Sequence, residues 1–285
     1  MKTCSKCKIE KDFNEFYCSK RTKDGFRERC KFCENLYNKI QSENRKNPFY
    51  KKRVKKYFNE SYFEIIDTED KAYFLGFICA DGCVRYDQNR GVYGVFLKIN
   101  KKDEHILNDF IKCVNGNISV RKDIIKDTVE IRLTGKKISN DLIKLGVYQN
   151  KTFSLKYPNI PPELERHFIR GYFDGDGCIR IKKDKRNGKE IGDMRFVSGS
   201  IDILNSINIR MEYLFGTKRN SLYGPKKGNY KFIGWSSMRD IESIYKGFYE
   251  DSNFYLNRKK ETFEKVINTI KDKIKYRKNK KIIIC

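Results

Sequence analysis

The chain has 285 residues, which suffices for about two domains. Its 62 Lys and Arg residues outnumber 37 Asp and Glu residues, and the net charge of +25 favours a polyanionic partner, with nucleic acid as the first candidate. No apolar run approaches the roughly 20 residues needed to span a bilayer, and residues 1–12 contain no apolar signal-peptide core. These features argue against a membrane-spanning or secreted protein, and a basic protein bound to a membrane surface is the weaker alternative to nucleic-acid binding. We therefore expect a cytoplasmic location in a prokaryote or phage, or an organellar one.

Four of the ten cysteines form two Cys-x-x-C pairs, which are separated by residues 8–29. Two such turns can place four thiolates around one tetrahedral metal ion, and a reducing compartment favours this use of cysteine over disulfides. The alternatives are unligated cysteine turns or a redox dithiol. Basic side chains near the pairs are expected to contact DNA, unless they form an ordinary solvated surface. We predict a structural Zn²⁺ site in an amino-terminal module, residues 1–37, formed by Cys4, Cys7, Cys30 and Cys33.

Residues 38–66 are rich in Lys and Arg and predict a basic linker with a helical part at residues 50–58. Such a run can follow the phosphates of a duplex, although a solvated charged helix agrees with the pattern nearly as well. The linker leads into the duplicated part of the chain, which begins at residue 67.

Residues 67–160 and 161–285 read as two copies of one pattern. The order helix–strand–strand–helix–strand–strand–helix appears twice, which predicts an α+β fold of two pseudo-symmetric repeats with antiparallel sheets. The segments of the first copy are a helix at 70–81, a strand at 91–100, a helix at 102–116, a strand at 128–135 and a helix at 136–146. Those of the second copy include strands at 178–184 and 193–200 joined by a two-residue turn at Asn187-Gly188, a helix at 200–216, a hairpin at 221–237, a helix at 238–250 and a long basic helix at 257–281.

Each predicted sheet has a basic face opposite an apolar one. A two-stranded ribbon of that kind can enter the major groove of DNA. The alternative is an ordinary solvated sheet with helices on its other face, but the net charge favours DNA. The candidate DNA-binding residues on these faces and on the tip of the last hairpin are Arg132, Arg180, Lys182, Arg195, Lys226 and Lys227.

Two apolar helical segments each carry two small residues four positions apart and then end in Asp-Gly-Cys. The small residues are Gly76 and Ala80 in the first segment and Gly171 and Gly175 in the second. Residues at i and i+4 share one face of a helix, and a face of Gly and Ala lets two backbones approach closely. We therefore predict that the two helices pack against each other and form an interface with a pseudo-two-fold axis.

This packing places Asp81 and Asp176 together at the carboxyl ends of adjacent helices. The helix dipole disfavours a carboxylate there by roughly 0.3–1 kcal/mol, and the two carboxylates also repel each other. Taken singly, an Asp-Gly can be a plain helix-ending turn, but the duplication argues against coincidence. A divalent cation removes the repulsion, and a carboxylate cluster suits Mg²⁺. The sequence therefore predicts a catalytic magnesium site that supports phosphodiester hydrolysis.

The segments FLGFICADG (residues 74–82) and IRGYFDGDG (residues 169–177) resemble the two motifs of the single-chain LAGLIDADG homing endonucleases. The resemblance covers about residue 67 to the carboxyl end, and it implies that Asp81 and Asp176 bind the catalytic metals. The sixth motif position, which is not a metal ligand in that family, is Asp174 in one copy and Cys79 in the other. A basic residue near each metal site is also typical of the family. Lys151 and Lys259 are the candidates, with solvated lysines as the alternative.

The same resemblance implies a monomeric double-stranded DNA endonuclease whose two sheets form a DNA-binding saddle over a long, asymmetric site. Such an enzyme cuts both strands across the minor groove, and the zinc module would extend its DNA footprint. The alternative is an intron maturase or a non-cleaving DNA-binding regulator with the same fold. A His–Asn–His nuclease is not expected, because the two histidines of the chain lie outside any such motif.

Overall fold

The computed structural model describes residues 1–46, 56–88, 91–225 and 227–283. The chain divides into two compact units, Met1–Lys55 and Lys56–Cys285. Among the described residues, no helix combines the length and the apolar character needed to cross a membrane.

The amino-terminal unit consists of two short antiparallel hairpins followed by one helix. Its hydrophobic centre is small and consists of Phe16 with the buried members of the cysteine pairs. The helix continues past residue 37, where the sequence predicted the end of the module. Residues 50–55 of the predicted linker helix lie outside the described residues, and residues 56–58 are not helical. The elements are β1 (Lys2–Thr3), β2 (Glu10–Lys11), η1 (Phe13–Glu15), β3 (Phe16–Cys18), β4 (Phe26–Cys30) and α1 (Lys31–Lys46).

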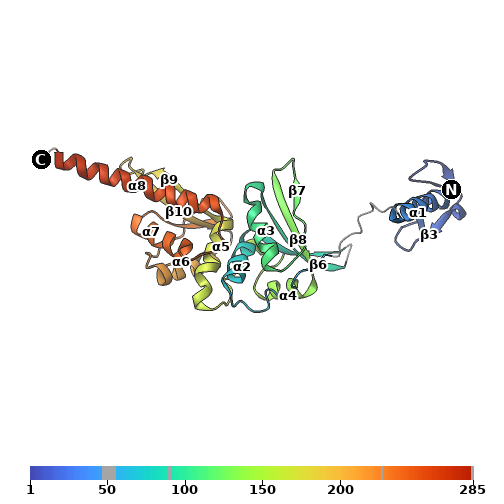
Figure 1. Cartoon of the computed structure of the whole chain (residues 1–285), viewed down its shortest axis with the longest axis horizontal. Helices are drawn as coiled ribbons and strands as arrows, with labels where there is room; N and C mark the ends of the chain where they lie inside the picture. The colour runs from blue at the N-terminus through green and yellow to red at the C-terminus, as the bar shows by residue number, and fades with distance from the viewer. Residues whose placement is uncertain (47–55, 89–90, 226, 284–285) are drawn as a thin grey trace. The chain divides into compact units, whose positions relative to one another are not determined.

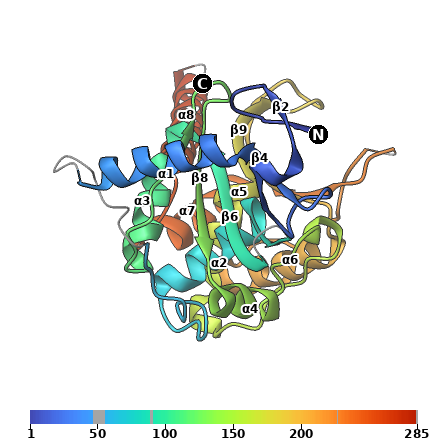
Figure 2. The ribbon, with the colours of Figure 1, turned by 90° about the vertical axis from the view of Figure 1, so that its right-hand side faces the viewer.

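The first repeat contains a four-stranded antiparallel sheet in the order β5-β6-β8-β7. Its central strands alternate as the sequence predicted, because Val95, Leu97 and Ile99 are buried while Lys98 is exposed. Figure 2 shows β6 and β8, which pair along their length. The elements are α2 (Glu69–Asp81), β5 (Gly82–Asp87), β6 (Val92–Asn100), η2 (Lys101–Asp103), α3 (Glu104–Cys113), β7 (Arg121–Asp123), β8 (Thr128–Thr134) and α4 (Lys136–Lys144).

The second repeat repeats this order but has a three-stranded sheet, β11-β10-β9. Its elements, after η3 (Lys151–Phe153) and η4 (Pro162–Leu164), are α5 (Glu165–Asp176), β9 (Gly177–Lys183), β10 (Glu190–Ser198), α6 (Ile201–Phe215), β11 (Lys231–Trp235), α7 (Met238–Tyr249) and α8 (Asn257–Ile283). The two repeats share one hydrophobic core, with α2 and α5 packed against each other between the two sheets (Figure 1).

Two local predictions for the second repeat were wrong. The described residues of the hairpin predicted at residues 221–237 form only one strand, β11, and the other arm is reduced to a single bridge between Tyr223 and Phe232. The connection between β9 and β10 is also longer than the two-residue turn that Asn187-Gly188 predicted. Gly188 adopts the expected positive φ of 67°, but the turn closes between the backbone groups of Asp184 and Lys189.

Candidate active site

The motif helices α2 and α5 cross at their small residues. A Cβ atom added to Gly76 would lie 2.0 Å from the carbonyl oxygen of Phe168, and one added to Gly171 would lie 2.0 Å from that of Tyr73. One turn further, a Cβ on Gly175 would lie 2.2 Å from the Cβ of Ala80. Only glycine leaves room for backbones this close, and the reciprocal contacts are those of a pseudo-two-fold axis.

A fully buried arginine, Arg170, ties the two motif helices to the segment before α8. Its guanidinium donates to the carbonyl oxygens of Phe254 and Phe248, at 2.8 and 3.0 Å, and to a carboxylate oxygen of Glu69 at 2.8 Å. Ser252 accepts a further bond at 2.6 Å. A buried charge is tolerated only when it is paired and hydrogen-bonded in this way. No pattern in the sequence predicts this network, because its members are far apart along the chain.

The carboxylates of Asp81 and Asp176 lie together at the carboxyl ends of the two helices. Asp81 Oδ2 is 3.4 Å from the point where a Cβ on Gly175, the neighbour of Asp176, would stand. Each helix ends at the glycine that follows its acid. The backbone N–H of Gly82 donates to the carbonyl oxygen of Ile78, and that of Gly177 donates to the carbonyl oxygen of Phe173. The helix dipoles therefore direct partial negative charge at a place that already holds two acids.

Loss of hydration raises the pKa of both motif acids. Asp81 is solvent-exposed and Asp176 is half-buried, but the dense protein around them disfavours charge on either carboxylate. The pKa of Asp176 rises to about 6, first because of burial and second because of the negative charge of Asp81. Burial also raises the pKa of Asp81, although the positive charges of Lys259 and Lys151 oppose the rise.

Each motif has a buried lysine against the end of its helix. Lys151 in η3 donates through Nζ to the carbonyl oxygen of Gly82 at 2.6 Å, and Lys259 in α8 donates to that of Gly177 at 2.7 Å. Lys259 also donates to the carbonyl oxygen of Phe173. Burial lowers the pKa of Lys259 to about 8, although nearby acids partly oppose the change. The two lysines thus occupy equivalent positions beside the motif acids.

Comparison with known proteins places this arrangement in a recognisable fold. Residues 163–234 match the sequence model of a family described as a LAGLIDADG-like domain. The LAGLIDADG meganuclease I-AabMI bound to uncleaved DNA superposes with a TM-score of 0.51 at 17% identity, over 70% of this chain and 91% of that one. The I-SmaMI LAGLIDADG homing endonuclease bound to cleaved DNA does so with a TM-score of 0.51 at 15% identity, over 73% and 91%. The chain has the fold of the LAGLIDADG meganucleases.

Part of the chain also matches the sequence of a curated protein that is not named as a nuclease. The probable translation initiation factor IF-2 of Methanocaldococcus jannaschii is 25% identical over 222 residues, which are 73% of this chain and 17% of that protein. The chain therefore spans less than a fifth of that relative.

I-SmaMI, one of the similar structures, has also been solved bound to its uncleaved DNA target in the presence of calcium ions.

The sixth LAGLIDADG position differs between the two motifs and has a structural part in one of them. Asp174 is buried and accepts hydrogen bonds from Tyr73 Oη at 2.7 Å and from the backbone N–H of Leu256 at 2.8 Å. It therefore fixes the start of α8, which carries Lys259. Cys79 at the matching position of α2 is buried, and burial raises the pKa of its thiol to about 12.

A hollow of 370 Å³ opens beside the first motif acid. It is lined by the Asp81 side chain, by Lys151 and by the loop before it, where Asn150 adopts a left-handed conformation with φ of 63°. Arg85 of β5 also lines it. The hollow combines a carboxylate with cationic side chains, which suits an anionic group bound through a divalent cation.

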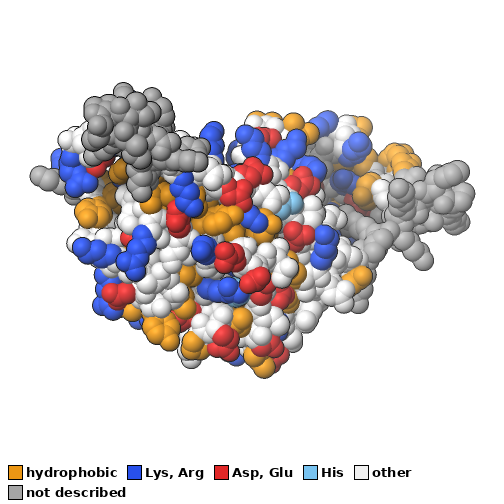
Figure 3. Space-filling model, turned by 60° about the vertical axis from the view of Figure 1, so that its left-hand side comes forward, with side chains coloured by type: hydrophobic (Ala, Val, Ile, Leu, Met, Phe, Trp, Pro, Cys, Tyr) orange, Lys and Arg blue, Asp and Glu red, His pale blue; other side chains and the backbone are white. Residues whose placement is uncertain are grey.

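Most of the predicted DNA-binding residues of the second repeat meet at one acid. Arg180, Lys182 and Arg195 all contact Asp193 on the sheet face opposite the core. In the first repeat, Arg132 pairs with a different acid, Asp87, at 2.8 Å. Lys227 is exposed in the turn before β11, and Lys226 lies outside the described residues. The face of the molecule in Figure 3 carries mixed charges, with Lys and Arg side chains interspersed with acidic ones.

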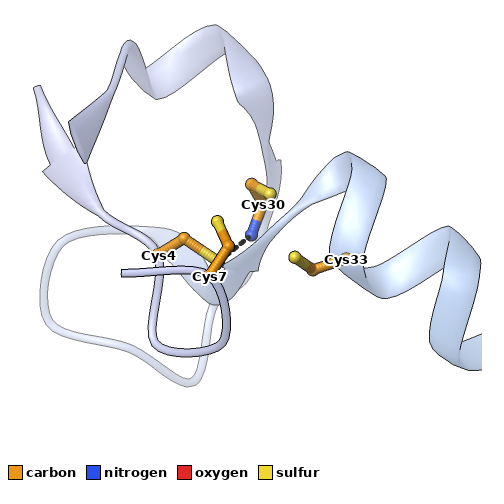
Figure 4. A group of neighbouring side chains, drawn as sticks. All are labelled: Cys4, Cys7, Cys30 and Cys33. Atoms are coloured by element: carbon orange, nitrogen blue, oxygen red, sulfur yellow. Dashed lines mark hydrogen bonds between the residues drawn. The ribbon is translucent and has the colours of Figure 1, made fainter. Parts of the chain in front are cut away.

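Four of the five cysteines of the amino-terminal unit, Cys4, Cys7, Cys30 and Cys33, point toward one another (Figure 4). Their sulfur atoms all lie within 4.8 Å of one another, which makes this the one cluster of three or more possible metal ligands in the described parts of the chain. Cys4 and Cys7 flank the turn after β1, Cys30 ends β4 and Cys33 lies in the first turn of α1. Burial raises the pKa of Cys4, but backbone N–H groups, that of Cys30 first, outweigh burial and lower the pKa to about 6.

Proposed function

We propose that this protein is a site-specific double-stranded DNA endonuclease that acts as a pseudo-symmetric monomer and hydrolyses phosphodiesters with divalent metal ions. One observation carries the proposal: Asp81 and Asp176 converge at the ends of two glycine-packed helices, each beside a buried lysine. A stable core alone gives no reason to place two acids with raised pKa values side by side. The meganuclease neighbours on uncleaved and cleaved DNA support the proposal.

The donor set at the motif ends is compatible with Mg²⁺. This ion prefers oxygen ligands and is usually held by one or two carboxylates, with water and substrate phosphates completing the shell. Asp81 and Asp176 would supply such carboxylates, and a bound cation would offset the repulsion by which Asp81 raises the pKa of Asp176. When bound, Mg²⁺ supplies an activated water and stabilises the leaving oxygen in phosphodiester hydrolysis.

The buried lysines have two roles in this proposal. Their Nζ groups satisfy carbonyl oxygens at the ends of α2 and α5, so they hold the two acids in place. Their positive charges also lower the pKa of both acids and keep the carboxylates ionised near neutral pH. Lys259 and Lys151 are further placed to balance the negative charge of a phosphate.

We further propose that the amino-terminal unit binds structural Zn²⁺. Tetrahedral Zn–S bonds of about 2.3 Å require sulfur atoms about 3.8 Å apart, and the four cysteines approach this arrangement. A unit with so small a hydrophobic centre gains much of its stability from such a metal. Its exposed basic side chains would extend the contact with DNA.

The proposed activity can be tested with plasmids that carry a randomised segment. The purified full chain should convert a subset to linear DNA with Mg²⁺ and should bind without cutting when Ca²⁺ replaces it. Replacement by Ca²⁺ is preferable to chelation, because a chelator would also remove zinc. Asp81→Asn and Asp176→Asn should abolish cutting, whereas Asp202→Asn, on the exposed start of α6, should leave it intact.

Two results would contradict the proposal. Failure to linearise any plasmid, with binding to a preferred sequence retained, would instead indicate the regulator or maturase function. Cutting that survives both motif substitutions would show that the active site lies elsewhere.

A further inference from the structure

The acid at the centre of the second sheet, Asp193, is surrounded by three cations. Its carboxylate contacts Arg180 Nε at 3.1 Å, Lys182 Nζ at 2.6 Å and Arg195 Nη2 at 2.8 Å. Strand register places Asp193 directly opposite Arg180 on β9, with Arg195 two residues further along β10. All four side chains therefore lie on the face of the sheet that turns away from the core.

Asp193 is buried on an otherwise open surface. Its side chain is only 3% exposed, whereas those of Arg180, Lys182 and Arg195 are 55%, 32% and 24% exposed. The cations themselves thus cover the acid, and they remain accessible to a ligand. Burial raises the pKa of Asp193, but hydrogen bonds from Lys182 and Arg195 outweigh it and lower the pKa. The acid is therefore ionised at neutral pH.

An ion pair that only stabilised the fold would not require three cations around one acid. One carboxylate with three cations leaves a local charge of +2, which a sheet surface has no reason to concentrate. Buried ion pairs are in addition weak contributors to stability. The remaining donors are also well placed for a partner: Arg180 uses Nε for the acid, which leaves its two Nη groups, and Lys182 uses one donor of its three.

The residues around these three cations also give the surface a defined shape. The Arg195 guanidinium lies 4.7 Å from the ring centre of Phe232, and a Cβ on Gly234 would come within 2.9 Å of Arg195 Cγ. The missing side chain at Gly234 therefore makes room for Arg195 to lie flat across the strand. A hollow of 650 Å³ opens over this surface, and the charged side chains of its lining are the cations Lys182, Arg186, Arg195 and Lys218 and the acids Asp193 and Asp240.

We propose that Asp193 is a positioning residue that holds Arg180, Lys182 and Arg195 as a preformed unit for reading two or three adjacent base pairs in the major groove. The inference rests on the proposed DNA recognition. Side chains two positions apart on a strand are separated by about 6.8 Å, which is about two base-pair steps of roughly 3.4 Å. Arg and Lys donors match the two acceptors of guanine, so guanine-containing pairs are the expected target.

The test is selection of preferred duplexes from a randomised pool in Ca²⁺, followed by sequencing, for the full chain and two variants. Asp193→Asn keeps the shape of the side chain but frees the cations. Asp109→Asn, on α3 and paired only with Lys112 among the described contacts, makes the same charge change away from the sheet. Thermal unfolding is used to confirm that each variant is folded.

Asp193→Asn should lower base discrimination about tenfold at each of two or three adjacent positions, while its affinity for unrelated duplex rises no more than that of Asp109→Asn. Arg195→Gln should lose discrimination at a subset of the same positions. If Asp193→Asn does not fold, Asp193→Glu, which keeps the charge but displaces the cations, should affect the same positions.

An unchanged sequence preference, or a loss spread evenly over the whole site, would overturn the inference. If the wild type selects no sequence at all, the proposed DNA recognition fails together with it. If the wild type selects a sequence but does not cut it with Mg²⁺, only the proposed endonuclease activity fails.

Discussion

Replacement of a motif acid should stabilise the metal-free protein while it abolishes cutting. In the folded chain the pKa of Asp176 rises from its ordinary 3.8 to about 6. Each tenfold change in proton affinity corresponds to about 1.4 kcal/mol, so full burial would imply a cost of about 3 kcal/mol for the ionised group. Because Asp176 keeps some contact with water, we expect Asp176→Asn to recover about 1–2 kcal/mol. For a unit of this size, the melting temperature should rise by about 2–8 °C.

The stabilisation expected from Asp176→Asn depends on pH. Between pH 4 and pH 6 the folded carboxyl binds a proton more tightly than the unfolded one, so the wild type loses stability as pH rises through this window. The difference between Asp176→Asn and wild type should therefore be largest above about pH 7 and should vanish near pH 4. Saturating Mg²⁺ should stabilise the wild type, by about 2.7 kcal/mol at 100 times its dissociation constant, and should leave the variant nearly unchanged.

The assay is thermal unfolding of metal-free protein at pH 7.5 and at pH 4.5, with zinc retained. Asp67→Asn is the control, because Asp67 is exposed and a hydrogen bond from Lys71 lowers its pKa. That substitution should not raise the melting temperature. An Asp176→Asn variant that melts at or below the wild-type temperature at pH 7.5 would refute the argument that the two acids are held against an electrostatic cost.

Three further outcomes are expected. Gly76→Ala should lower the free energy of unfolding in urea by about 3 kcal/mol, because its Cβ would meet the carbonyl oxygen of Phe168 at 2.0 Å; an unchanged midpoint would contradict the packing. Elemental analysis should find about one zinc per chain, and Cys30→Ser should remove amide protection from residues 1–46 alone. Lys259→Met should shift the acidic limb of the cleavage rate to higher pH, because Lys259 lowers the pKa of both motif acids, whereas Lys260→Met should not.

The elements that local patterns specify were predicted with small errors. The strand at Val92–Asn100 follows from alternation, and the end of α2 follows from Gly82, because both signals depend on neighbours in the chain. The prediction of a second hairpin in the last repeat was wrong for the same reason, because it also depended on local signals alone. Its turn residues favoured two strands, but the arm around Tyr223 makes only one bridge to Phe232, and pairing depends on what the rest of the sheet allows.

The sequence by itself determined the duplication, the cysteine pairs and the two small-residue helices that end in Asp81 and Asp176, because each is a repeated spacing of residue types. Only the tertiary structure decided what surrounds them. The charge of Arg170 is satisfied by partners from residue 69 to residue 254, and the cations of the second sheet converge on Asp193 from two strands. Burial and long-range contact set these environments, and neither property is encoded in the spacing of neighbouring residues.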